Sequence, residues 1–189
     1  MKKTITTLLF ITATFFYTHS LDAQIMNINS TKSSINWLGK KITGQHEGSI
    51  NLLSGSLIIE NGLLSGGDFV VDMSSISATD IQGEGAKKLE KSLKSEEWFA
   101  VAKHPQATLI FTSVVSLGEG LYDITGDFTI KGKTNPTTFE FYLNNLEAKT
   151  KVIIDRTLYD ILHGSESFIV SMKDKVIYND FEIDVNLKF

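Results

Sequence analysis

Apolar and polar residues alternate over most of the chain after residue 25, and the longest unbroken run lies at the C-terminus. From Phe181 to Phe189 every second side chain is apolar, and the residues between them are polar or charged. Successive side chains of a β-strand point to opposite faces, so this pattern predicts a strand with one buried face and one face in water. Residues 122–130 and 139–143 alternate in the same way and are also predicted to be strands.

Weaker alternation and turn-forming residues divide the rest of the chain into short extended segments. Further strands are predicted at residues 34–41, 47–53, 56–60, 67–74, 107–117, 149–156 and 167–173. Turns are predicted at Ser54-Gly55, Asn61-Gly62, Gly118-Glu119-Gly120, Asn144-Asn145 and Asp174-Lys175. About nine or ten short strands without a strand–helix rhythm predict one all-β domain, built as an antiparallel barrel or sandwich.

Residues 84–103 depart from this pattern and are predicted to be helical. Ala86, Leu89 and Leu93 recur at roughly helical spacing among lysines and glutamates, and Ser95 is placed to cap a second short turn. Pro105 disfavours a helical conformation at the residue before it and ends the segment. We therefore expect a short helical segment between two strands of the sheet.

The N-terminus has the layout of a secretory signal peptide. Lys2 and Lys3 precede an apolar run over residues 5–17, which is too short to be trusted as a membrane span, and small residues follow it. Cleavage is expected after Ala23, with Ser20 as the alternative. Residues 1–23 are thus the predicted signal peptide and residues 24–189 the mature domain, whose expected location is the periplasm or the outside of the cell.

The charge and composition narrow the classes of function. The formal net charge is −4, so the chain has no basic surface of the kind that binds nucleic acid or an anionic membrane. No cysteine is present, which excludes disulfides and a cysteine-linked lipid anchor. The three histidines of the predicted mature domain, at 46, 104 and 163, lack the close spacing of a metal-binding motif, so we predict no metal and no cofactor.

A polar cluster near the C-terminal third invites a catalytic hypothesis. His163 with Asp155 or Glu166 would suit a hydrolase or isomerase, in which a histidine base is oriented by a carboxylate. Ser165 lacks the Gly-x-Ser-x-Gly sequence of a nucleophile elbow. Catalysis is therefore the less favoured hypothesis.

Several segments spread over the predicted domain resemble the YceI-like, polyisoprenoid-binding family. They are residues 41–48 (KITGQHEG), 66–73 (GGDFVVDM), 93–99 (LKSEEWF) with His104-Pro105, 122–132 (YDITGDFTIKG) and 154–160 (IDRTLYD) with Gly164-Ser165. The resemblance implies a lipocalin-like antiparallel barrel of about eight strands with a helical segment near one mouth. It also implies an apolar tunnel for an isoprenoid-type lipid. A barrel of this size either fills its interior with side chains or holds one small ligand, and alternation alone does not distinguish the two.

The candidate tunnel lining consists of the large apolar residues on the inward faces of the strands and two aromatic residues of the helical segment. They are Trp37, Phe69, Val71, Met73, Trp98, Phe99, Leu109, Phe111, Ile124, Phe128, Phe139, Phe141, Phe168, Phe181 and Val185. The leading hypothesis is a non-enzymatic protein that sequesters or transports an isoprenoid-type lipid or another long apolar ligand. The alternative from another class is an interaction module that docks a partner protein through the Trp98-Phe99 surface. A homodimer is left open.

Overall fold

The alternating segments form one antiparallel sheet in residues 23–165 and 176–189, the part of the chain that this computed structural model describes. Its elements are β1 Gln24–Asn27, β2 Ser34–Lys41, β3 Gly44–Glu60, β4 Leu63–Ala78, α1 Gly83–Lys94, β5 Gln106–Gly118, β6 Leu121–Ile130, β7 Lys133–Leu143, β8 Glu147–Asp155, the 3-10 turn η1 Arg156–Tyr159, and β9 Ile177–Lys188. The strand predicted at residues 167–173, with the turn at Asp174-Lys175, lies outside the described residues.

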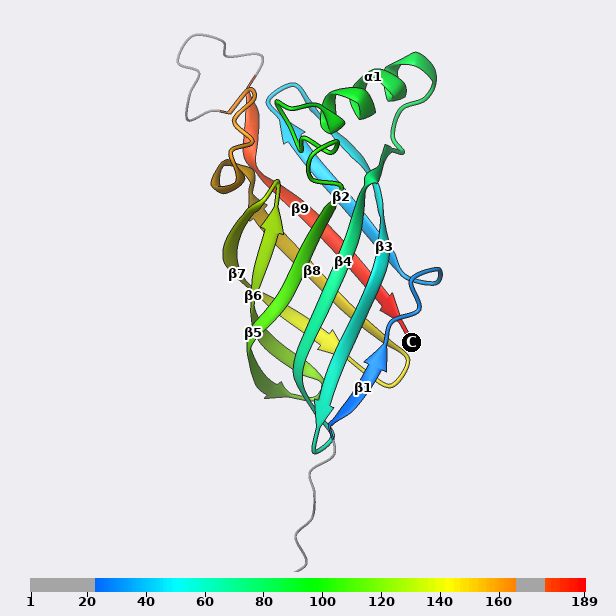
Figure 1. Cartoon of the computed structure of the whole chain (residues 1–189), viewed down its shortest axis with the longest axis vertical. Helices are drawn as coiled ribbons and strands as arrows, with labels where there is room; N and C mark the ends of the chain where they lie inside the picture. The colour runs from blue at the N-terminus through cyan, green and yellow to red at the C-terminus, as the bar shows by residue number, and fades with distance from the viewer. Residues whose placement is uncertain (1–22, 166–175) are drawn as a thin grey trace, which may run out of the picture.

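The sheet closes on itself. Its order is β1-β3-β2-β9-β8-β7-β6-β5-β4, and the further pairing of β4 with β3 completes an eight-stranded barrel of β2 to β9, with β1 added beside β3 (Figure 1). This confirms the predicted all-β, antiparallel, lipocalin-like barrel. At one end lie the β2–β3 hairpin, α1 and η1, and we call this end the capped mouth; the opposite end is the closed end.

The predicted break at Ser54-Gly55 is wrong, because β3 runs through it without a turn. The pairing of β3 with β4 shifts register between Leu52 and Ser54, which marks a bulge rather than a chain reversal. Gly55 leaves room for the Phe69 ring, because a Cβ at this position would lie 2.7 Å from a ring carbon of Phe69. The predicted turn at Asn61-Gly62 is confirmed, and both residues are left-handed, with φ of 54° and 78°.

Strand β7 begins six residues earlier than the alternation predicts and includes Pro136. Proline has no N–H to donate, so it is tolerated only where a strand lacks a neighbour on that side. Pairing between β7 and β8 covers only Phe141 to Leu143, which leaves the Pro136 half of β7 paired with β6 alone. There η1 packs beside β7, and the Asn135 side chain donates to the Leu158 carbonyl at 3.0 Å.

Helix α1 covers the capped mouth and is shorter than predicted (Figure 1). It ends at Lys94, and residues 95–103 continue as turns instead of helix. The N–H groups of Phe99 and Val101 donate to the Leu93 and Lys94 carbonyls, which satisfies acceptors at the helix end. Ala100, left-handed with φ of 48°, reverses the chain toward the barrel.

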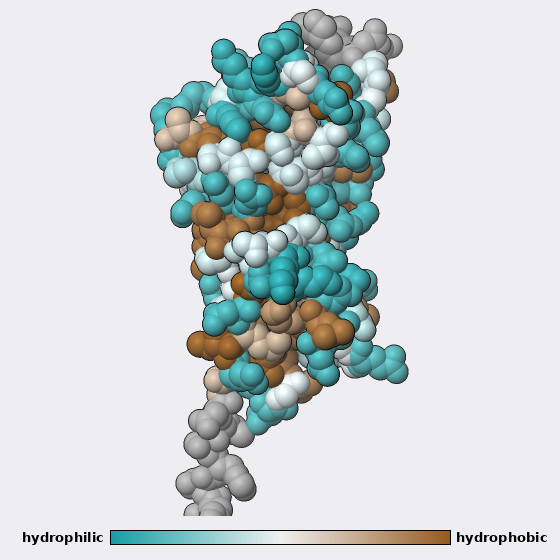
Figure 2. Space-filling view, turned by 90° about the vertical axis from the view of Figure 1, so that its right-hand side faces the viewer, coloured by the Kyte–Doolittle hydropathy of each residue, from teal (hydrophilic) through white to brown (hydrophobic). Residues whose placement is uncertain are grey.

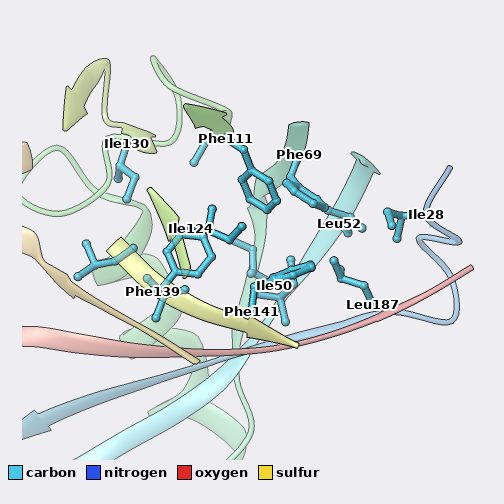
Figure 3. Packing of buried hydrophobic residues seen from close by; sticks show 14 of the residues in the cluster. Ile28, Ile50, Leu52, Phe69, Phe111, Ile124, Ile130, Phe139, Phe141 and Leu187 are labelled. Carbon is cyan, nitrogen blue, oxygen red and sulfur yellow. The ribbon is translucent and has the colours of Figure 1, made fainter. Parts of the chain in front are cut away.

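The closed end is filled by side chains. Leu57, Ile124 and Ala148 have no exposed surface, and Phe141 is 1% exposed. Above them the rings of Phe69, Phe111, Phe139 and Phe141 converge from three strands, β4, β5 and β7 (Figure 3). The face of the molecule that Figure 2 shows is largely hydrophilic and carries separate hydrophobic patches on the barrel wall.

Candidate functional site

The barrel encloses a cavity of about 400 Å³ between the aromatic cluster and the capped mouth. This volume lies within the range of about 300–1,000 Å³ that is typical of small-molecule sites. Phe111 and Phe141 border its deep part. Leu89 and Leu93 border it from α1, which together with the turns of residues 95–103 forms what we call the cap. The interior is therefore filled at the closed end and hollow toward the mouth, a distribution that alternation along the strands does not reveal.

Almost all of the predicted lining residues border this cavity. They are Trp37, Phe69, Val71, Met73, Trp98, Phe99, Leu109, Phe111, Phe128, Phe139, Phe141, Phe181 and Val185. Ile124 does not border it, because it lies lower on β6 and is fully buried in the core. Phe168 lies outside the described residues. Contact of these side chains with a ligand stays a prediction.

Trp98 and Phe99 pack inward over the mouth from the turn that follows α1. The Phe99 ring meets Phe181 of β9 edge-on, with centroids 6.3 Å apart. The Trp98 ring lies 5.6 Å from the His163 ring and 5.4 Å from the Arg156 guanidinium carbon. Both side chains are partly buried and border the cavity, and docking of a partner protein through them stays a prediction.

The cavity wall is apolar in the barrel and polar at the mouth. Its polar side chains, apart from Thr150 deeper on β8, are Lys40, Lys41, His46, Ser92, Thr108, Arg156, His163, Tyr178 and Asp180. The His46 and His163 side chains border the cavity and are 33% and 49% exposed, so the cavity wall reaches the protein surface at these two residues. Lys41 and Arg156 continue the inward alternation of β2 and β8, but neither was among the predicted lining residues.

Two histidine–carboxylate pairs connect the cap to the barrel. His46 at the start of β3 lies 2.8 Å from Asp80, which precedes α1, and His163 lies 3.0 Å from Glu97, which follows it. Partial burial would raise the pKa of the Asp80 carboxyl, but hydrogen bonds from His46 and from backbone N–H groups outweigh that effect and lower it. Ionised Asp80 therefore stabilises the contact between β3 and the segment that precedes α1.

The lowered pKa predicts a pH dependence of stability. The contribution of Asp80 should be present above the pKa of an unfolded aspartate, about 3.9, and should be lost as the pH falls through the lower folded-state value. Asp80→Asn should accordingly be less stable than the wild type at pH 7, and the difference should shrink toward pH 3. Urea unfolding at several pH values measures this, and a difference that stays constant would contradict the prediction.

The candidate catalytic residues do not assemble into one site among the described residues. The Asp155 carboxylate accepts hydrogen bonds from the Thr157 N–H and hydroxyl at 2.8 and 2.6 Å, and Asp155 does not border the cavity. The carboxylate beside His163 is Glu97 instead, and Glu166 lies outside the described residues. In residues 23–165 and 176–189 no three metal-ligating side chains gather at one point.

No helix in the described ranges has the length and apolar character needed to cross a membrane.

A family model described as the YceI-like domain matches residues 26–189. Protein YceI of Escherichia coli O17:K52:H18 is 43% identical over 65 residues, 34% of this chain and 33% of that protein. A UPF0312 protein of Pseudomonas putida strain W619 is 40% identical over 55 residues, 29% of each chain. The matched segments thus span about a third of these relatives' own length.

Solved structures with the same fold are more distant in sequence. BcnA of Burkholderia cenocepacia superimposes with a TM-score of 0.67 at 19% identity, over 85% of this chain and 98% of that one. A domain of Saccharophagus degradans, described as polyisoprenoid-binding and implicated in plant cell wall breakdown, superimposes with a TM-score of 0.59 at 17% identity. That match covers 89% of this chain and 97% of the other. The family match over residues 26–189, with a barrel of the same fold, establishes that this chain belongs to the YceI-like domain family.

Proposed function

We propose that the protein binds a long-chain, isoprenoid-type lipid in the barrel, in order to sequester or transport it. The observation that carries this proposal is the hollow between the closed end and the cap, walled by aromatic and branched aliphatic side chains from β2 to β9. Polar groups along its wall are few below the mouth. No set of converging acid, base or nucleophile accompanies it in the described residues, so binding explains the site better than catalysis.

The physical chemistry of an isoprenoid chain suits such a wall. The chain offers no hydrogen-bonding group along its length, so its affinity comes from the burial of CH₂ and CH₃ groups, at about 0.8 kcal/mol each. Ordering the flexible chain offsets part of this gain. The Saccharophagus degradans domain of the same fold is described as polyisoprenoid-binding, which supports the same ligand class here.

The proposal includes export of the mature domain. Residues 1–23 have the charge and apolar pattern of a signal peptide, so the lipid would be bound in the periplasm or outside the cell. The intact mass of the protein purified from its native host should correspond to a chain that begins at Gln24, or at Leu21 if cleavage follows Ser20. A mass that retains residues 1–23 would contradict export by cleavage.

Native mass spectrometry tests the binding function directly. The protein isolated under native conditions should carry an added mass that organic extraction removes, and the extract should contain a long-chain lipid. The delipidated protein should then take up a C20 isoprenoid such as geranylgeraniol with a one-to-one stoichiometry. Failure both to carry an extractable lipid and to take up the isoprenoid would overturn the proposal.

Phe99 should control how long the ligand is retained. Phe99→Ala removes the ring that packs edge-on against Phe181 above the cavity. A loss of about 1.4 kcal/mol of binding free energy weakens the affinity tenfold. We therefore expect the ligand to be released about tenfold faster from Phe99→Ala than from the wild type. His104→Ala is the matched control, because His104 precedes β5, packs against Gly132 and does not border the cavity. Equal release rates in the two variants would show that Phe99 does not guard the mouth.

A further inference from the structure

The aromatic cluster forms a floor across the barrel. Its members, which all border the cavity, are Phe69, Phe111, Phe139 and Phe141. The Phe111 ring centroid lies between 5.4 and 6.1 Å from the centroids of the other three, so the rings pack against one another. Leu57, Ile124 and Ala148 do not border the cavity and have no exposed surface. A water-sized molecule cannot reach them, and the cavity therefore ends at the floor.

The height of the wall above the floor limits how much of a lipid tail fits inside. On β2 the inward row that borders the cavity runs from Ile35 to Lys41, and on β8 and the start of η1 it runs from Thr150 to Arg156. Each row thus covers six steps along the chain. At about 3.3 Å per step, and with strands tilted by about 40° from the barrel axis, the hollow is about 15 Å deep.

An isoprenoid tail can be compared with this depth and with the cavity volume. Carbon–carbon bonds of about 1.5 Å advance an extended chain by about 1.2 Å each, so an isoprene unit with its four chain bonds spans about 5 Å. A methylene group fills about as much space as a water molecule, about 30 Å³, so a cavity of about 400 Å³ takes about 13 carbon atoms. Both estimates correspond to about three isoprene units.

We propose that the aromatic cluster limits the enclosed part of the tail to three or four isoprene units, so that the protein is matched to short isoprenoid lipids. This inference rests on the proposed lipid-binding function and adds the length class of the ligand. The tail enters first, because the wall is apolar toward the floor and polar at the mouth. Longer tails extend out of the mouth, where the additional units are not buried and add no affinity.

Prenols of increasing length test the proposal. Geraniol, farnesol, geranylgeraniol and solanesol, with two, three, four and nine isoprene units, would be offered in equimolar pairs to the delipidated protein from one cyclodextrin carrier. Native mass spectrometry would count the complexes. Farnesol should be bound at least tenfold more than geraniol, whereas solanesol should not be preferred over geranylgeraniol. A tenfold preference for solanesol would overturn the length limit while lipid binding stands. If none of the four binds, the proposed function itself fails.

A floor variant assigns the limit to the aromatic cluster. Phe141→Ala removes one ring of the floor and extends the hollow toward the closed end. The preference for geranylfarnesol, which has five units, over geranylgeraniol should rise at least fivefold above the wild-type value, and the contribution of the carrier cancels in this comparison. Ile124→Ala is the matched control, because Ile124 is equally buried but does not border the cavity, and its preference should equal that of the wild type.

A second variant reduces the hollow and leaves the floor intact. Gly39 borders the cavity, and a Cβ built there meets no atom within 4 Å, so Gly39→Leu places its side chain in the hollow without a clash at the Cβ. The preference for geranylgeraniol over farnesol should fall at least threefold below the wild-type value. An unchanged preference in Gly39→Leu would overturn the proposal, whether or not Phe141→Ala folds.

Discussion

Replacing Phe111 by alanine is expected to lower the free energy of unfolding by about 3–5 kcal/mol, the usual cost of removing a buried phenylalanine. Phe111 is 9% exposed and lies at the centre of the aromatic cluster. Its ring centroid is 5.4 Å from Phe69, 6.1 Å from Phe139 and 5.6 Å from Phe141, so one ring contacts three rings on two other strands, β4 and β7 (Figure 3). Alanine would remove all three contacts together.

The neighbouring residue on the same strand provides the control. Ile110 points outward and is 55% exposed, so Ile110→Ala should cost less than about 1 kcal/mol. Urea unfolding of the delipidated proteins compares the two variants without any ligand contribution. Similar losses in Phe111→Ala and Ile110→Ala would mean that the aromatic cluster does not organise the barrel interior.

Replacing Gly48 by alanine is expected to be nearly as damaging, at about 3 kcal/mol or more, the upper part of the range for overpacking. A Cβ on Gly48 would lie 1.8 Å from the Ser77 carbonyl oxygen and 2.6 Å from two indole carbons of Trp37. The Trp37 Nε1 donates to that same carbonyl at 3.1 Å. The methyl group would therefore separate β3 from β4 or displace the indole, and a displaced indole would leave a polar group without its partner.

Gly39 is the matched control for this substitution. It lies on the same inward row as Trp37, and a Cβ built there meets no atom within 4 Å. Gly39→Ala should change the free energy of unfolding by less than about 1 kcal/mol and is expected to be neutral or stabilising. Fluorescence in a Trp98→Phe background would report on Trp37 alone, because the chain has two tryptophans. An unchanged Trp37 signal with wild-type stability in Gly48→Ala would contradict the packing described here.

The sequence predicted the wall of the site better than its mouth. Trp37, Phe69 and Phe111 follow from alternation, because a strand that faces a core must place an apolar side chain at every second position. Lys41 and Arg156 continue the same alternation by one more inward position. A charged residue at the end of a strand is, however, equally typical of a solvent-exposed position. That both residues border the cavity depends on which strands are neighbours, and alternation within a strand carries no information about that.

The paired histidines show the same limit. His163 is close in sequence to Asp155 and Glu166, which suggested a catalytic arrangement, but its observed partner is Glu97, 66 positions away. The cap brings these two residues together, because the turn after α1 folds back over the barrel through the left-handed Ala100. Spacing along the chain predicts contacts within one element, whereas contacts between a cap and a rim arise from the path of the intervening chain.

Alternation and turn residues predicted an antiparallel all-β domain, either a barrel or a sandwich, with a helical segment near residues 84–103, and the short motifs that resemble the YceI-like family favoured the barrel. Those properties are local, since they depend on period-two alternation, turn residues and a proline. The tertiary structure was needed to show that β3 is continuous, that Ile124 fills the core while Phe111 borders a hollow, and that Lys41 and Arg156 both border the cavity. The physical reason is closure: register, strand order and the balance between side-chain volume and barrel volume are set by all the strands together.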